Sequence, residues 1–248
     1  MTGGKYMSGH SKWSQIKHKK ALTDAKKGKV FSKLVRQIAI AARQKGVDPE
    51  ANPNLRMLIE KARSFNMPQD NIERAIKKGA GELEGQKFEE FTLEAYGAGN
   101  TAIIIEGTTD NKNRTVSEIK FLLTQHNGKL ANSGSVMWLF ERCGAINIKK
   151  PAAATKEDLE LTAIDSGAQD FKWLDEENLE IVTQPEELEK VKKALAEKGL
   201  AADESSLDWR PKNEVTAPDE KTKEQLEKLF DALDENDDVS EIYSNLKT

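Results

Sequence analysis

Residues 79–85 read Gly-Ala-Gly-Glu-Leu-Glu-Gly, a glycine-rich acidic stretch at which the apolar periodicity changes from helical to strand-like. Residues 1–80 carry 18 Lys and Arg against 6 Asp and Glu, whereas residues 81–248 carry 20 against 36. The two regions therefore have formal charges of +12 and −16, which give the net charge of −4 for the 248-residue chain. We predict a domain boundary here, between a basic module and an acidic body.

This charge asymmetry favours a polyanionic partner for the basic module, most simply nucleic acid, because Lys and Arg bind phosphates. The alternative is ordinary solvated charge, although helix faces in globular proteins normally mix both signs. No stretch approaches the roughly 20 apolar residues that span a bilayer, and no apolar signal segment follows Met1. A single cysteine excludes an internal disulfide. We therefore expect a cytoplasmic protein without a membrane partner.

Upstream of the glycine-rich stretch, the periodicity predicts a three-helix domain over residues 24–80. The first helix runs from about Asp24 to Lys45, the second opens with Asn52-Pro53, and the third runs from Pro68 to Gly79. One stripe of the first helix is apolar and packs, so the opposite face is expected to be exposed. That face carries the candidate phosphate contacts Lys26, Lys29, Lys33, Arg36 and Arg43.

Residues 7–23 are basic and contain few apolar groups, which predicts an arm whose order depends on a partner. Residues 1–6 are interpreted as a short extension outside the fold. Trp13 is either a residue that stacks on a base or ribose, or an anchor of the arm against the helices. The other candidate nucleic-acid contacts of the arm are Lys12, Lys17, His18, Lys19 and Lys20.

Downstream, the pattern predicts an α+β region. Strands are expected near residues 88–96, 101–108 and 136–140, with a helix over residues 115–125 that begins with a capping box of Thr115 and Glu118. Residues 143–205 follow the order βαββαβ, which is the split ferredoxin-like pattern. A helix over 221–233 and a strand over 239–243 would then complete the earlier sheet.

The predicted fold class is therefore α+β multidomain, with an N-terminal three-helix domain and two ferredoxin-like α+β domains, one inserted in the other. The middle domain is expected to comprise residues 86–142 and 206–248. Residues 143–205 form the inserted domain.

The sequence lacks the common nucleophile, phosphate-loop and zinc-protease signatures, so we expect no enzyme, no cofactor and no metal. Cys143 has no identifiable histidine partner and is interpreted as structural. Residues 97–99 join two predicted strands, which favours a hairpin turn over a dinucleotide loop. The acidic run Asp234, Glu235, Asp237 and Asp238 is expected to be solvated rather than to bind a cation, and residues 110–114 are expected to cap a helix.

Seven segments are informative in combination: residues 7–13 (MSGHSKW), 16–20 (IKHKK), 24–29 (DAKKGK), 66–72 (NMPQDNI), 96–99 (YGAG), 109–115 (TDNKNRT) and 134–138 (GSVMW). With them the chain, from Met7 to near its end, resembles the YebC/PmpR family. The resemblance implies an N-terminal helical domain followed by two α+β domains. It also implies a nonenzymatic nucleic-acid binder, either a DNA-binding transcriptional regulator or a translation factor similar to the mitochondrial translational activator of cytochrome c oxidase subunit I.

The residues slightly favour the second function, because no helix shows a base-reading cluster and no coiled coil provides a dimer for palindromic DNA. Structured RNA, ribosomal or transfer, is recognised by shape and phosphate placement. A translation factor of this kind assists ribosomes stalled on proline-rich segments; the alternative partner is promoter DNA. The family motif with Asn66, Met67 and Pro68 is either a contact loop or a tight helix connection. A scaffold without nucleic acid would leave the basic module without a purpose.

Overall fold

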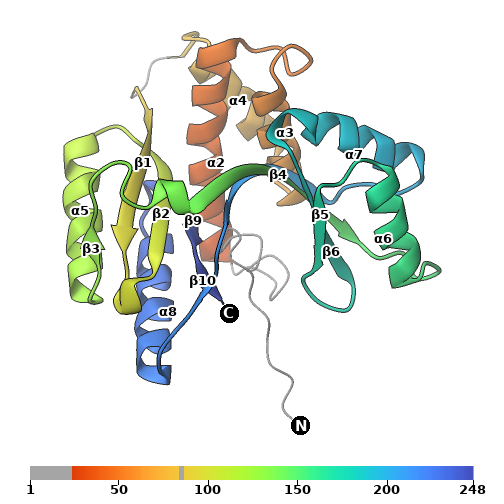
Figure 1. Cartoon of the computed structure of the whole chain (residues 1–248). Helices are drawn as coiled ribbons and strands as arrows, with labels where there is room; N and C mark the ends of the chain where they lie inside the picture. Colours follow the sequence, from red (N-terminus) through yellow and green to blue (C-terminus); the bar gives the residue numbers. More distant parts are fainter. Residues whose placement is uncertain (1–23, 84–86, 248) are drawn as a thin grey trace. The chain divides into compact units, whose positions relative to one another are not determined.

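The computed structural model describes the backbone of residues 24–83 and 87–247. The predicted arm of residues 7–23 lies outside this part of the chain. The described residues form two compact units, of which one contains residues 141–210 and the other contains the rest. Figure 1 shows the elements of both units. We call residues 24–83 the helical domain, residues 87–140 with 211–247 the middle domain, and residues 141–210 the inserted unit.

The helical domain consists of α2 (Asp24–Lys45), α3 (Pro53–Ser64) and α4 (Gln69–Gly79). Asn52 caps α3, because its side chain accepts from the amide of Leu55 at 3.1 Å and donates to the carbonyl of Ala41 at 2.9 Å. The three helices enclose one apolar core, made of Val30, Leu34, Ile38, Ala41, Ala42, Leu55, Ile59, Ala62, Phe65, Met67, Ile72 and Ala75. The predicted three-helix domain is therefore confirmed.

The middle domain is a four-stranded antiparallel sheet of order β3-β1-β2-β9 with two helices on one face (Figure 1). Its elements are β1 (Glu89–Tyr96), β2 (Ala102–Thr109), α5 (Lys112–Gln125), β3 (Lys129–Leu130), α8 (Glu220–Asp234) and β9 (Val239–Ser244). Alternate residues of the strands, such as Ile103 and Ile105, pack against Leu123 of α5 and Leu226 of α8. The α5 and α8 side chains thus close a two-layer core.

The predicted hairpin turn at residues 97–99 is confirmed, since the 3₁₀ turn η1 (Ala98–Asn100) joins β1 to β2. Gly99 has a φ of 66°, and a Cβ on Gly97 would lie 2.6 Å from the Leu226 side chain. Position 97 therefore needs glycine, because a larger residue would collide with the Leu226 side chain of α8.

Two predictions about the middle domain are wrong. The helix begins at Lys112 rather than Thr115, with Asn111 as its cap, so Thr115 and Glu118 form no capping box. Residues 136–139 form no strand: they contain the 3₁₀ turn η2 (Met137–Leu139), a strand begins only at Phe140, and the sheet of the middle domain instead gains the short β3. The amides of Val136 and Met137 are bonded to the buried carboxylate of Glu94, so they cannot join a strand ladder.

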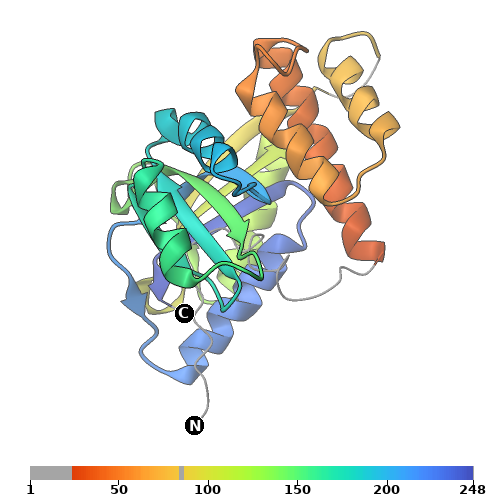
Figure 2. The ribbon, with the colours of Figure 1, turned by 90° about the vertical axis from the view of Figure 1, so that its right-hand side faces the viewer.

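The inserted unit has the order βαββαβ and a sheet of order β5-β6-β4-β7, which confirms a ferredoxin-like fold. Figure 2 shows both of its α-helices on one face of this sheet. The helix α6 begins with a capping box of Thr155 and Asp158. The elements are β4 (Phe140–Lys149), α6 (Lys156–Asp165), β5 (Asp170–Trp173), β6 (Asn178–Thr183), η3 (Pro185–Glu187), α7 (Leu188–Glu197) and β7 (Glu204–Pro211).

A parallel pair that the sequence did not predict joins β8 (Val215–Thr216) to β10 (Leu246–Lys247).

Candidate nucleic-acid interface

The cationic face of α2 lies against the middle domain. Lys33 is only 4% exposed, and its Nζ donates to the carbonyl of Asp234 at 2.7 Å, with a carboxylate oxygen of that residue at 3.7 Å. One turn earlier, Lys29 pairs with the carboxylate of Glu235. Burial lowers the pKa of Lys33 more than the neighbouring Asp234 raises it, whereas the hydrogen bond to Glu235 raises the pKa of Lys29. The end of α8 therefore supplies the counter-charges for the start of α2.

Asp238 is the centre of this contact. It is 4% exposed, and its carboxylate accepts from Arg36 at 2.7 Å, Arg114 at 2.6 Å and the Thr115 hydroxyl at 2.6 Å. Burial raises the pKa of Asp238, but the hydrogen bonds from Thr115 and Arg114 outweigh it, so the pKa lies below its ordinary value. The helical domain and the middle domain thus share one buried, fully charged carboxylate.

Two hydrogen bonds to its backbone position Asp238. The Asp238 amide donates to the side chain of Asn236 at 2.9 Å, and the Asp238 carbonyl accepts from the amide of Thr108 at 2.8 Å. A Cβ on Gly107 would lie 2.0 Å from that carbonyl, so only glycine allows β2 and the start of β9 to approach this closely. The register of the β2–β9 pair shifts at this point. The resulting irregularity turns Asp238 away from the ladder and towards α2 and α5.

A cavity of about 460 Å³ opens beside Asp238. Its lining mixes both signs of charge, which suits an interdomain salt-bridge network better than a phosphate pocket. The lining residues are Lys29, Arg36, Phe88, Asp110, Arg114, Glu118, Glu235, Asn236, Asp237 and Asp238. Arg36 also lies 5.3 Å from the centre of the Phe88 ring.

The contact continues along α2 and α3. Arg43 donates to the carbonyl of Phe88, and Gln44 donates to the carboxylate of Glu90 at 3.0 Å. On α3, Lys61 pairs with Glu241 of β9 at 2.6 Å. We call all these contacts between the helical domain and the middle domain the charged junction. Lys61 was not among the predicted site residues, because no spacing in the sequence connects it to a strand 180 residues away.

Two expectations about this face are corrected. Lys33 was expected on an exposed face and is buried, because the charged side of α2 packs against a second domain. The acidic run of residues 234–238 was expected to be solvated, yet Asp238 is buried and Asp234, Glu235 and Asp238 contact α2. The role of Lys29, Lys33, Arg36 and Arg43 as phosphate contacts stays a prediction. The Lys26 side chain and the candidates Lys12, Trp13, Lys17, His18, Lys19 and Lys20 lie outside the described residues.

The loop between α3 and α4 closes as a Schellman motif. The amide of Met67 donates to the carbonyl of Ala62 at 3.0 Å, and the amide of Asn66 donates to the carbonyl of Arg63 at 2.9 Å. Asn66 has the φ of 60° that this motif requires. Met67 is buried in the helical core, which favours the tight helix connection, and the contact loop stays a prediction. Asn66 and Pro68 are exposed and remain candidates.

Three exposed cations lie on the other helices of the domain: Arg63 at the end of α3, and Arg74 and Lys77 on α4. Within the described part of the chain, none of the three forms an ion pair. They are not among the predicted contacts, because they form no dense stripe on one helix. Their signal was available, since each lies outside the apolar positions Ile59, Ala62, Ile72 and Ala75 that the structure buries.

Comparison with known proteins now identifies the family. The model described as "TACO1/YebC protein N-terminal domain" matches residues 11–82, and that described as "TACO1/YebC second and third domain" matches residues 88–246. The chain belongs to the TACO1/YebC family.

Relatives of this TACO1/YebC chain match over nearly their whole length. A protein from Thermosipho melanesiensis is 49% identical, with 96% of this chain and 93% of the relative covered, and one from Persephonella marina is 49% identical, with 97% and 96% covered. Both are described as "Probable transcriptional regulatory protein". The crystal structure of a conserved hypothetical protein from Aquifex aeolicus is 47% identical and has a TM-score of 0.87, with 95% of this chain and 96% of that chain covered.

Cys143 and the histidines of the TACO1/YebC chain are the other residue types that could carry chemistry. Cys143 is buried, and burial raises the pKa of its thiol to about 12, so the thiol stays protonated at neutral pH. His126 is the C-cap that follows α5, and the described residues contain no cluster of metal-ligating side chains. Among the helices of residues 24–83 and 87–247, none is long and apolar enough to cross a membrane.

Proposed function

We propose that this protein is a nonenzymatic regulator of gene expression that binds nucleic acid through its N-terminal helical domain. The observation that carries the proposal is the exposure of Arg63, Arg74 and Lys77 on a domain whose region of the chain has a charge of +12. A cation that has no acidic partner is available for phosphate. The description that the relatives carry, "Probable transcriptional regulatory protein", supports a regulatory role.

The charged junction reduces the number of helical-domain cations that are available to nucleic acid. Lys29, Lys33 and Arg36 already have carboxylate partners, so a phosphate would have to displace an acidic group from each of them. Arg63, Arg74 and Lys77 need no such exchange. We therefore assign the main phosphate contacts to α3 and α4, together with the predicted contacts of the arm in residues 7–23.

The first turn of α4 supports recognition by shape rather than by base sequence. A helix that reads the major groove presents base-contacting side chains at its N-terminal end. Here that end carries Asp70, and the side-chain Nε2 of Gln69 donates to the carboxylate of Glu73 at 3.1 Å. The cations Arg74 and Lys77 lie further along the helix. This distribution favours a structured RNA target, and hence a translation factor that acts at the ribosome.

The second candidate is a DNA-binding transcriptional regulator. The specific observation in its favour is the description "Probable transcriptional regulatory protein" that the relatives carry at 49% identity. A transcriptional regulator must prefer its operator over bulk DNA by roughly a thousandfold or more. The two candidates thus differ in a measurable quantity.

Two assays on the full chain test the proposal. We expect cosedimentation with ribosomes at moderate salt and little difference in affinity between a promoter fragment and a scrambled duplex. A thousandfold preference for a promoter fragment without ribosome association would favour the transcriptional regulator. Failure to bind ribosomes, structured RNA and duplex DNA alike would contradict nucleic-acid binding itself.

A further inference from the structure

The loop of residues 131–139 presents an exposed tryptophan on a fixed backbone. Trp138 is 65% exposed, although its neighbours Val136 and Phe140 are buried. Single exposed apolar side chains are common on protein surfaces, so the significance of this ring depends on its surroundings. The loop carries one of the segments by which the chain resembles its family, yet neither the fold nor the charged junction explains the ring.

A buried carboxylate fixes this loop. Glu94 of β1 is 4% exposed, and its side chain accepts from the amides of Gly134 at 2.5 Å, Val136 at 2.6 Å and Met137 at 2.9 Å. Burial raises the pKa of Glu94, but these backbone hydrogen bonds outweigh it and hold the pKa below its ordinary value. A charged acceptor with three donors leaves the loop little conformational freedom. Trp138 is therefore held in place before any ligand binds.

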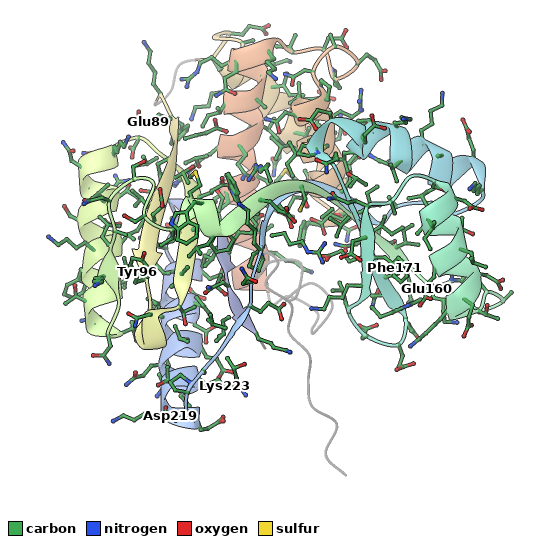
Figure 3. All side chains as sticks on the ribbon, viewed as in Figure 1. Glu89, Tyr96, Glu160, Phe171, Asp219 and Lys223 are labelled. Carbon is green, nitrogen blue, oxygen red and sulfur yellow. The ribbon has the colours of Figure 1, made fainter. Side chains whose placement is uncertain are left out.

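The polar edge of the indole is already satisfied. The Nε1 of Trp138 donates to the carbonyl of Ser135 at 3.0 Å, and the same carbonyl accepts from the hydroxyl of Tyr96 at 3.1 Å. Tyr96 lies at the end of β1 (Figure 3). What Trp138 offers to a ligand is thus an aromatic surface rather than a hydrogen-bond donor. Such a surface suits stacking on a flat, polarisable ring.

The charge around the loop suits a phosphate-bearing ligand. Residues 119–140 contain no Asp or Glu, and the carboxylate of Glu94 that holds the loop is buried and accepts from three backbone amides. The Nζ of Lys212 donates to the carbonyl of Trp138 at 2.9 Å, and the Nζ of Lys129 lies 5.7 Å from the centre of the Tyr96 ring. Cations beside an exposed aromatic ring are the arrangement with which proteins bind unpaired nucleotides.

We propose that Trp138 is a stacking platform for an unpaired nucleobase, with Lys212 and Lys129 placed for the flanking phosphates. This inference rests on the proposed function and deepens it, because it specifies single-stranded segments of the target. In a duplex, neighbouring base pairs cover the faces of each base, so the platform discriminates between single-stranded and fully paired nucleic acid.

The test measures the affinity of the full chain for a labelled single-stranded RNA of mixed sequence and for a blunt duplex of the same sequence. Trp138→Ala should weaken single-strand binding by roughly 5- to 100-fold and leave duplex binding unchanged. Trp138→Phe should retain part of the affinity, because a smaller ring still stacks. Phe121→Ala is the matched control, since Phe121 is a similarly exposed aromatic residue on α5 that the proposal does not use.

Three outcomes would contradict the role of Trp138 as a stacking platform without contradicting nucleic-acid binding. The first is single-strand affinity of Trp138→Ala equal to that of the wild type. The second is an equal loss for single strand and duplex with a lowered melting temperature, which would give Trp138 a structural role. The third is lost ribosome cosedimentation with unchanged RNA affinity, which would indicate a protein partner. By contrast, a wild-type chain that binds neither RNA would contradict the proposed function itself.

Discussion

Two sets of cations in the helical domain have opposite surroundings. On α2, Lys29, Lys33 and Arg36 contact acidic residues of the middle domain, and Lys33 is buried. On α3 and α4, the exposed Arg63 and Lys77 form no ion pair within the described part of the chain. A dense cationic face is thus as compatible with an interdomain contact as with a phosphate site. A complementary acidic segment elsewhere in the chain is what distinguishes an interdomain contact from a phosphate site.

The difference has an energetic basis. Removing a charge from water is costly, so a buried cation is tolerated only where a counter-charge and hydrogen bonds are in place. Asp234 and Asp238 provide them at the junction. An exposed cation has no such requirement and remains available to a ligand. The two sets should therefore respond to substitution in different ways, one in stability and the other in binding.

The largest effect is expected at the centre of the junction. Asp238→Ala leaves Arg36, Arg114 and Thr115 without their shared acceptor, which should lower the free energy of unfolding by about 3–5 kcal/mol. Urea denaturation followed by circular dichroism measures this loss. Asp237→Ala is the control, since its side chain is exposed and its carbonyl still accepts from Arg36, and its effect should stay within about 0.5 kcal/mol. Equal effects of the two variants would contradict the central role of Asp238.

The next effect concerns binding alone. Replacing Arg63, Arg74 and Lys77 together by Glu should weaken binding of structured RNA by roughly 100-fold or more and lower the salt slope by about three, with little change in melting temperature. Fluorescence anisotropy over a salt series measures both quantities. A control with the same change in charge replaces the exposed Lys198, Lys221 and Lys228 by Glu. If the control weakens binding as much, net charge rather than this surface determines affinity.

A smaller effect is expected at the edge of the junction. A double-mutant cycle of Lys61→Ala and Glu241→Ala should give a coupling energy of roughly 1 kcal/mol, because both side chains are mostly covered. The more exposed pair of Lys156 and Glu176 in the inserted unit should give less than about 0.5 kcal/mol. Equal coupling energies in the two pairs would show that the neighbouring domain does not strengthen the ion pair that it covers.

The smallest effect should appear on acidification. The pKa of Asp238 is lowered in the folded chain, so its contribution to stability is complete above its pKa in the unfolded chain and is lost as the pH falls through the folded-state value. The gap in melting temperature between the wild type and Asp238→Asn should therefore narrow below about pH 4. Thermal melts between pH 6 and pH 3 measure it. A gap that is independent of pH would mean that the charge of Asp238 does not matter.

Much of the fold follows from local patterns. The helix of residues 24–45 was predicted with its observed bounds, because apolar residues such as Leu34 and Ile38 recur at helical spacing and form one buried stripe. The two following helices were predictable from their own apolar spacing. Their limits depend on residues within one or two turns of each other.

The errors arise where a distant residue decides. The segment 136–140 reads as a strand until the carboxylate of Glu94, some 40 residues earlier, takes its amides. The cationic face of α2 reads as exposed until Asp234 and Asp238, some 200 residues later, fold against it, whereas its role as a phosphate site stays a prediction. Neither partner is visible in a local pattern, because topology alone brings these residues together. The candidate site was therefore harder to predict than the elements that carry it.

The separation of the junction partners along the chain has a consequence for biosynthesis. Arg36 and Asp238 are 202 residues apart, so at ordinary elongation rates roughly 10–40 s pass between their syntheses. During this interval α2 can already pack against α3 and α4 while its cationic face lacks its acidic cover. The nascent chain thus exposes a basic surface beside the ribosome, and emergence of residues 234–238 neutralises it. Slow elongation before that segment would prolong nonspecific RNA contacts of the unfinished protein.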